Sequence, residues 1–133
     1  MADYASVGLT LGRHPLALLR PALRKAGLCT AGDITALPDG SAVCTAGIVL
    51  MRQRPTAAGG VTFVTLEDES GQVNIIVWAR VGDVCREALV SARLLEVRGR
   101  LQRQDGVTHI IARRLRDRTA LLGTLLTRSR DFH

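Results

Sequence analysis

Residues 41–118 alternate between short apolar segments rich in β-branched residues and polar segments that favour turns. Apolar residues at helical spacing across Val81–Val90 predict one helix within this region, with Val84 and Leu89 on its apolar stripe. The polar segments Glu67–Gly71 and Gln104–Gly106 are short enough to join their neighbouring strands as hairpins. The alternation predicts strands at Val43–Met51, Val61–Leu66, Val73–Trp78, Leu94–Arg103 and Val107–Leu115.

The order of these elements predicts the fold class. Three strands, one helix and two strands within about seventy residues is the arrangement of a five-stranded OB-fold barrel. We therefore expect a mainly β protein in which residues 41–118 form this barrel. Closing the barrel also removes exposed strand edges, which otherwise invite aggregation.

The segments on either side of the barrel are predicted to be helical or irregular. Residues 1–40 are expected to form a short helical N-terminal arm that packs on the barrel. Pro21 interrupts its apolar periodicity and predicts either a kink or two short helices. Thr30 followed by Asp33 resembles a capping pair that begins a second short helix. Residues 119–133 are expected to form a C-terminal tail containing a short Leu-rich helix.

The charge balance points to a polyanionic partner. The chain has 18 Lys and Arg against 12 Asp and Glu, a net charge of +6, and all but one of the basic residues are arginine. Arginine matches phosphate oxygens and stacks on bases, so nucleic acid is the first partner to consider. A GC-rich genome, which encodes Arg in place of Lys, is the alternative explanation, and composition alone does not decide between them.

The expected fold indicates where a ligand would bind. An OB barrel binds nucleic acid across strands 2 and 3, between the loops that follow strands 1 and 4. Single strands are held there by cationic grooves and aromatic side chains. Residues at these places and on the outer faces of strands 4 and 5 form the predicted nucleic-acid-binding set: Arg52, Arg54, Phe63, Asn74, Trp78, Arg98, Arg100, Arg103 and Arg114.

Several members of this set have a structural alternative. Phe63 stacks on a base in the functional interpretation and belongs to the core in the other. For Trp78 we favour a half-buried packing role beside the helix. Arg98 and Arg100 are equally consistent with a solvated outer face. Asn74 could instead hydrogen-bond a neighbouring loop.

Catalytic and metal-binding patterns are missing from the sequence. Glu67, Asp68 and Glu69 form a dense carboxylate group, but we interpret them as turn formers rather than metal ligands. The cysteines form no CxxC pair, and neither a phosphate-binding GxxxxGK[ST] loop nor a GxSxG elbow occurs. We therefore expect no enzyme activity, cofactor, metal or small-molecule substrate. No apolar run approaches the ~20 residues that span a bilayer, so we expect a cytoplasmic protein without a membrane partner.

Several segments of the chain also resemble a known family. They are AGIVLMRQRP at 46–55, FVTLEDESG at 63–71, NIIVW at 74–78, 97–103 and 109–115, continued by the opening 8–15 and the ending 129–132. In these segments the chain resembles the C-terminal OB-fold region of bacterial error-prone DNA polymerases, translesion subunits of the polymerase III alpha type. The similar anticodon-binding domains of class II synthetases place unpaired bases at the positions of Phe63 and Asn74.

The resemblance implies a role in damage-induced, mutagenic DNA replication across lesions. The polymerase and phosphatase-like domains of that family are absent from these residues, so its catalysis does not carry over. We therefore expect a non-catalytic module that binds single-stranded DNA for an error-prone polymerase. The alternative is a protein-interaction module that docks onto a polymerase or mutasome subunit, with nucleic-acid contact incidental. An RNA-binding domain is a third possibility.

Overall fold

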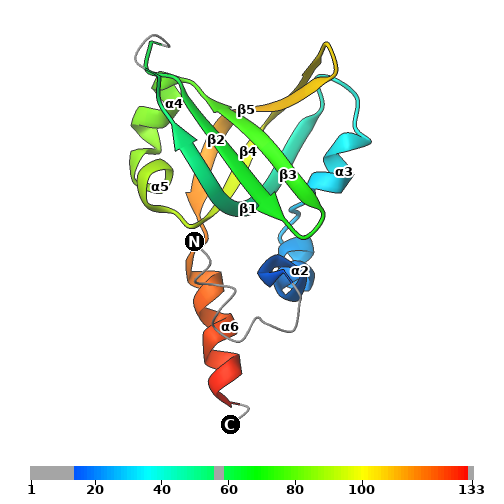
Figure 1. Cartoon of the computed structure of the whole chain (residues 1–133), viewed down its shortest axis with the longest axis vertical. Coiled ribbons are helices and arrows are strands. Elements are labelled where there is room, and N and C mark those ends of the chain that lie inside the picture. The colour runs from blue at the N-terminus through cyan, green and yellow to red at the C-terminus, as the bar shows by residue number, and fades with distance from the viewer. Residues whose placement is uncertain (1–13, 56–58, 132–133) are drawn as a thin grey trace.

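The centre of the molecule is a closed five-stranded barrel (Figure 1). The computed structural model describes residues 14–55 and 59–131, with side chains as far as Leu125. Neighbouring strands follow the order β1-β2-β3-β5-β4; β3 and β5 run parallel and the other pairs antiparallel. The predicted OB-type barrel is thereby confirmed. Its strands are β1 (Ala42–Gln53), β2 (Thr62–Asp68), β3 (Gly71–Val77), β4 (Leu94–Gln104) and β5 (Val107–Asp117).

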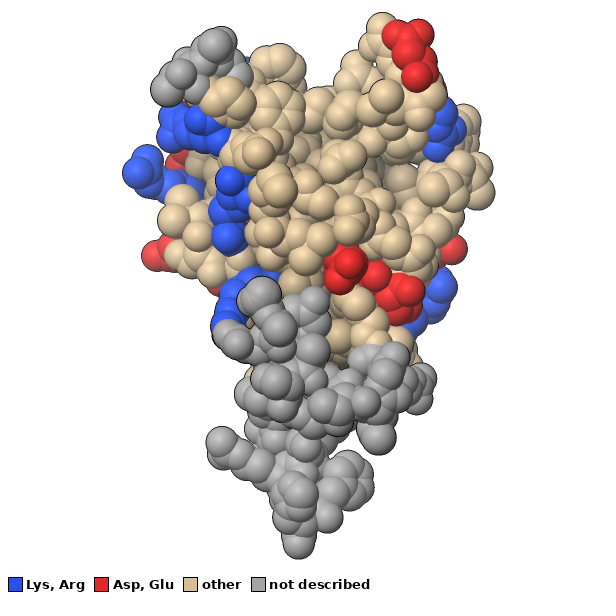
Figure 2. Space-filling model, viewed as in Figure 1, with Lys and Arg blue, Asp and Glu red and all other residues tan. Residues whose placement is uncertain are grey.

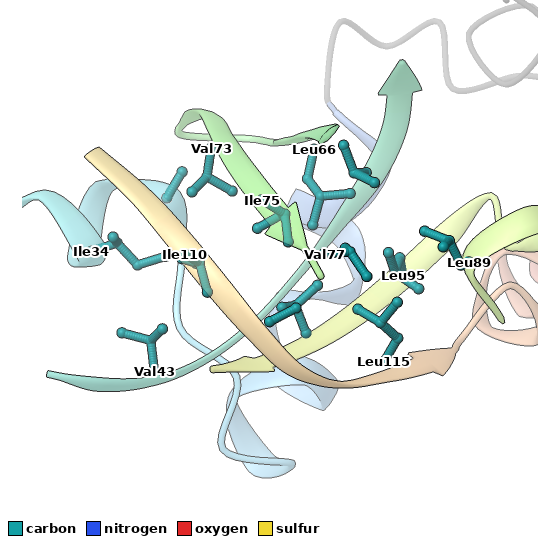
Figure 3. Packing of buried hydrophobic residues seen from close by; sticks show 14 of the residues in the cluster. Ile34, Val43, Leu66, Val73, Ile75, Val77, Leu89, Leu95, Ile110 and Leu115 are labelled. Carbon is teal, nitrogen blue, oxygen red and sulfur yellow. The ribbon is translucent and has the colours of Figure 1, made fainter. Parts of the chain in front are cut away.

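Alternating side chains divide each strand between the barrel interior and its outer surface. In β2, Val64 and Leu66 are fully buried, whereas Phe63, which directly precedes Val64, is 38% exposed. Inward residues from all five strands meet in one apolar core (Figure 3). Ile34 closes one end of this core and Leu89 closes the other.

Strand β1 pairs on both sides, because it bends partway along its length. Its residues 42–48 pair with β4 and residues 48–53 pair with β2, with a register shift between Val49 and Met51. At the bend, a Cβ on Gly47 would lie 2.8 Å from the Leu66 Cβ. Because Gly47 has no side chain, the backbone of β1 can lie this close to Leu66 of β2.

Two short helices, not the single predicted helix, connect β3 to β4. They are α4 (Ala79–Val84) and α5 (Arg86–Ser91), and they meet at Cys85. The backbone of Cys85 has φ −106° and ψ 30°, outside regular helical geometry, and this break changes the direction of the chain between α4 and α5. Leu89 consequently reaches the barrel core, while Val84 is 83% exposed. The prediction that Val84 shares the apolar stripe was therefore wrong.

The remaining helices are α2 (Pro15–Lys25), α3 (Ala31–Thr35) and α6 (Ala120–Asp131). Of these, α2 and α6 pack on the outside of β1, while α3 covers one end of the barrel. Leucines of α2 and Leu125 of α6 form a second apolar cluster with Ala46 and Ile48 of β1. Helix α2 continues as one helix through Pro21, where the sequence predicted a kink or two helices. Residues 1–13 of the predicted arm and residues 132–133 of the predicted tail lie outside the described residues.

The acidic β2–β3 turn fastens α2 and α3 to the barrel. Asp68 Oδ2 accepts a hydrogen bond from the Ala31 backbone N–H at 2.7 Å, at the start of α3. Thr30 and Asp33 form the predicted capping box of that helix. Arg20 of α2 donates two hydrogen bonds to the Glu69 carboxylate, at 2.6 and 2.8 Å, and they hold the pKa of Glu69 below its ordinary value. The turn thus has a structural role, because its carboxylates hold α2 and α3 against the barrel.

Across residues 14–55 and 59–131, no helix combines the length and apolar character needed to cross a membrane. Over the same residues, no group of three or more His, Cys, Asp and Glu side chains is arranged to hold a metal ion.

Candidate nucleic-acid interface

The outer face of β2 and β3 carries an exposed aromatic ring in an uncharged setting. Phe63 pairs across the strands with Ile76, and Thr65 pairs with Asn74. The Thr65 hydroxyl donates to Asn74 Oδ1 at 3.3 Å, which leaves the amide exposed on the surface. Figure 2 shows the centre of this face without charged side chains, with Asp and Glu gathered at its lower edge. We call these outer positions of β2 and β3 the β2–β3 face.

Two loops rise on either side of this face. One follows β1, and the other joins β4 to β5 through Asp105 and Gly106, both of which have positive φ (53° and 78°). Gly106 adopts this left-handed conformation without a steric cost, which permits the tight connection. Figure 2 shows the surface hollowed at its upper edge, beside the projecting β4–β5 connection. The face therefore lies in the position where OB barrels bind their ligands.

Arg54 and Trp78 lie at the same end of the face. A Cβ on Gly60 would lie 3.6 Å from the Arg54 guanidinium and 3.0 Å from the Ala79 Cβ, so Gly60 sits between the loop and the start of α4. Trp78 is the residue that precedes α4, and it is 54% exposed. An exposed indole and a guanidinium thus lie at the same end of the barrel.

Two predicted arginines bind backbone carbonyls within the protein. Arg52 Nε donates to the Leu89 carbonyl at 2.6 Å, and its Nη2 donates to the Ala92 carbonyl, so Arg52 binds the C-terminal end of α5. Burial lowers the pKa of Arg52. Arg103 Nη1 donates to the Leu37 carbonyl at 2.6 Å, just after α3. Sequence reasoning missed these roles, because the carbonyls come from distant segments of the chain.

The other predicted arginines lie on β4 and β5. Arg98, Arg100 and Arg114 project from the outer surface, as the alternation in β4 predicted, while Leu95 and Leu101 point into the core. In the barrel order, β4 is not a neighbour of β2 or β3. The structure therefore does not gather the predicted set at one place. It separates the residues of the β2–β3 face from the arginines of β4 and β5.

A closed five-stranded barrel with an exposed aromatic residue between these loops defines an OB-fold domain. The family model described as OB-fold nucleic acid binding domain matches residues 43–118, and the chain belongs to this family. Over its full length, the chain is 56% identical to a protein named error-prone DNA polymerase from Alkalilimnicola ehrlichii, of which it covers 13%. It is 52% identical over its full length to a protein of the same name from Xanthomonas oryzae pv. oryzae, of which it covers 12%.

These relatives are much longer than the chain. A third relative with the same name, from Pseudomonas savastanoi pv. phaseolicola, is 52% identical over 99% of the chain, which covers 13% of it. The chain thus corresponds to an OB-fold nucleic-acid-binding domain found within error-prone DNA polymerases, and it spans only 12–13% of these relatives.

Solved structures show the same fold in other proteins. Asparaginyl-tRNA synthetase from Pyrococcus horikoshii matches with a TM-score of 0.57 and 21% identity, over 67% of this chain and 22% of that one. The ygiW protein from E. coli matches with a TM-score of 0.52 and 15% identity, over 67% of this chain and 87% of that one. At these identities, the likeness concerns the fold alone.

Proposed function

We propose that the chain is a non-catalytic module that binds single-stranded DNA on its β2–β3 face. The observation that carries the proposal is the exposed ring of Phe63 on an uncharged face between the two loops. Aromatic side chains on OB folds stack on unpaired bases, and each stacked base contributes ~1–3 kcal/mol. The exposed Asn74 amide supplies a donor and an acceptor for a base edge, and Arg54 supplies a phosphate contact.

The proposed ligand is a single strand because a duplex hides the base faces that Phe63 needs. Phe63 offers one flat ring and Trp78 offers a second at the end of the face, and stacked duplex bases expose no faces to either. Stacking of this kind tolerates any base sequence. We therefore expect weak base preference, with affinity that depends on salt through the phosphate contacts.

In a complete error-prone polymerase, this module would hold template strand close to the polymerase active site during damage-induced synthesis across lesions. The support is the match of the whole chain to 12–13% of proteins with that name. Catalysis would belong to the other parts of such a protein. The module's task would be to keep the unpaired template in position.

The test is fluorescence anisotropy with a labelled single strand of about 20 nucleotides, compared with the matched duplex and the matched RNA. We expect the DNA single strand to bind more tightly than the duplex, with an affinity that falls as salt rises. Tighter binding to RNA would reassign the ligand. No binding even at low salt would refute the proposal.

A protein-docking function is the second candidate. Val84 and Val90, on the helices between β3 and β4, are 83% and 61% exposed, and they offer two apolar side chains to a partner protein. Their substitution by Ser would weaken binding to the remaining part of the polymerase and leave DNA binding unchanged. Equal binding of that part by the wild type and the variant would contradict this candidate.

A further inference from the structure

A cationic groove lies on the side of the barrel formed by β1, β4 and β5. Its volume is about 530 Å³, and its walls come from the first half of β1, the middle of β4, one residue of β5 and the segments around α3. Arg98, Arg100 and Arg113 line it, and the described residues that line it include no Asp or Glu. We call it the arginine groove.

The charges in the arginine groove are poorly neutralised within the protein. Arg100 and Arg113 are exposed, and among the described residues neither side chain makes a hydrogen bond or ion pair. Arg98 pairs with Glu96 at 3.2 Å, but Glu96 is shared with Arg118 at 2.8 Å. By contrast, Arg118 and the two arginines of α2, Arg20 and Arg24, each have an acidic partner. The groove therefore brings together two arginines without an internal partner and a third that shares its partner.

Like charges also face each other beside the groove. Arg98 of β4 lies directly opposite Arg114 of β5. Opposed like charges on neighbouring strands destabilise a sheet. Burial raises the pKa of the Cys29 and Cys44 thiols that line the groove, so these thiols stay neutral and do not offset the charge. A bound polyanion would relieve this repulsion.

The arginine groove is connected to the β2–β3 face by one row of paired residues. Phe63 pairs with Ile76, Ile76 with Ile111, and Ile111 with Arg100. Neighbouring strands are 4.7–4.9 Å apart, so the three steps span about 14 Å along the surface. A strand of nucleic acid that leaves the Phe63 ring and crosses β5 arrives at Arg100 and the groove.

We infer that the arginine groove binds phosphates of the same single strand that the β2–β3 face holds by stacking. This inference rests on the proposed function and extends it to a second surface of the barrel. The β2–β3 face contacts bases and the groove contacts only backbone phosphates. A strand must therefore exceed a minimum length before the groove contributes to its affinity.

The experiment measures binding of oligothymidylates of about 3 and about 20 nucleotides. At about 3.4 Å or more per nucleotide, a trinucleotide centred on Phe63 falls short of the arginine groove, about 14 Å away, whereas the long strand passes it. The test variant of the 133-residue chain carries Arg100→Gln and Arg113→Gln. The control variant carries Arg86→Gln and Arg93→Gln, which remove the same charge from exposed positions that do not line the groove. Thermal unfolding confirms that both variants fold, as their exposed positions lead us to expect.

The salt slope is the change in the logarithm of the binding constant with the logarithm of salt concentration, and each lost phosphate contact lowers its magnitude by about 0.7 for a single strand. Losing two contacts therefore lowers it by about 1.4, which corresponds to roughly 25-fold weaker binding at about 0.1 M salt. We expect this loss for the test variant with the long strand and not with the short one, and no such loss for the control. If the two variants bind the long strand with equal affinity and equal salt slope, the inference that the groove binds phosphates is overturned. Binding of the short strand by the wild type would in that case still support the proposed function. If the wild type binds neither strand, both proposals fail.

Discussion

Replacing Phe63 by Leu separates the binding role of its ring from its packing role. The side chain is 38% exposed and packs against Ile76 across the strands. A cross-strand pair of this type contributes about 0.2–1 kcal/mol, and Leu retains part of it, so the free energy of unfolding should fall by less than ~1 kcal/mol. Loss of the aromatic surface removes one stacked base, about 1–3 kcal/mol of binding free energy. The dissociation constant for single-stranded DNA should therefore rise roughly 5- to 150-fold.

The neighbouring residue provides the matched control. Val64 is 1% exposed and points into the barrel core. Val64→Ala removes two buried methyl groups and leaves a cavity, so unfolding should become easier by about 2 kcal/mol. DNA affinity of the folded protein should not change. Urea unfolding and fluorescence anisotropy on both variants measure the two effects. Unchanged DNA affinity in Phe63→Leu would refute stacking on this ring.

Three further changes test the structure itself. A Cβ on Gly99 would lie 2.2 Å from the Ile111 carbonyl oxygen, so Gly99→Ala should destabilise the barrel by at least ~1–3 kcal/mol in urea unfolding; unaltered stability would contradict the close β4–β5 contact. Gly123 lies in helix α6, and apart from its chain neighbours and the backbone of its own helix no atom lies within 4 Å of an added Cβ. Gly123→Ala should therefore stabilise the protein by roughly 0.5–1 kcal/mol, and a loss of stability would contradict this open position in the helix. The hydrogen bonds from Arg20 lower the pKa of Glu69 from its ordinary value of 4.5, so their stabilising contribution is complete above that value and is lost as the pH falls through the lower folded-state value. The stability difference between wild type and Glu69→Gln should consequently shrink between pH 7 and pH 3, and a constant difference would contradict the ion pair.

The barrel could be predicted from the sequence because strand patterns are local. Alternation of apolar and polar residues assigned Leu95 and Leu101 to the interior and Arg98 and Arg100 to the surface, as the structure has them. The break at Cys85 could not be predicted in this way, because the apolar periodicity continues through it. Only the need to bring Leu89 into the end of the barrel explains the break, and that need depends on tertiary packing.

The candidate site was less predictable, because a charged residue does not reveal its partner. Arg52 and Arg103 have the same local character as Arg54 and Arg100, yet the first two bind backbone carbonyls and the last two bind none in the described residues. The carbonyl of Leu89 lies 37 positions along the chain from Arg52. Such pairs follow from how the helices close the ends of the barrel, which no local pattern encodes.

The separation of Phe63 from the β4 and β5 arginines also changes how binding should depend on conditions. Stacking on the β2–β3 face loses little strength in salt, because it involves no counterion release, whereas phosphate contacts at the arginine groove weaken steeply. With both on one face, the two contributions would respond together to any change in the strand. With about 14 Å of barrel surface between them, a strand of about three nucleotides contacts the ring alone and a long strand contacts both. The stability that the opposed pair Arg98 and Arg114 costs the free barrel is then recovered only when a strand is long enough to reach them.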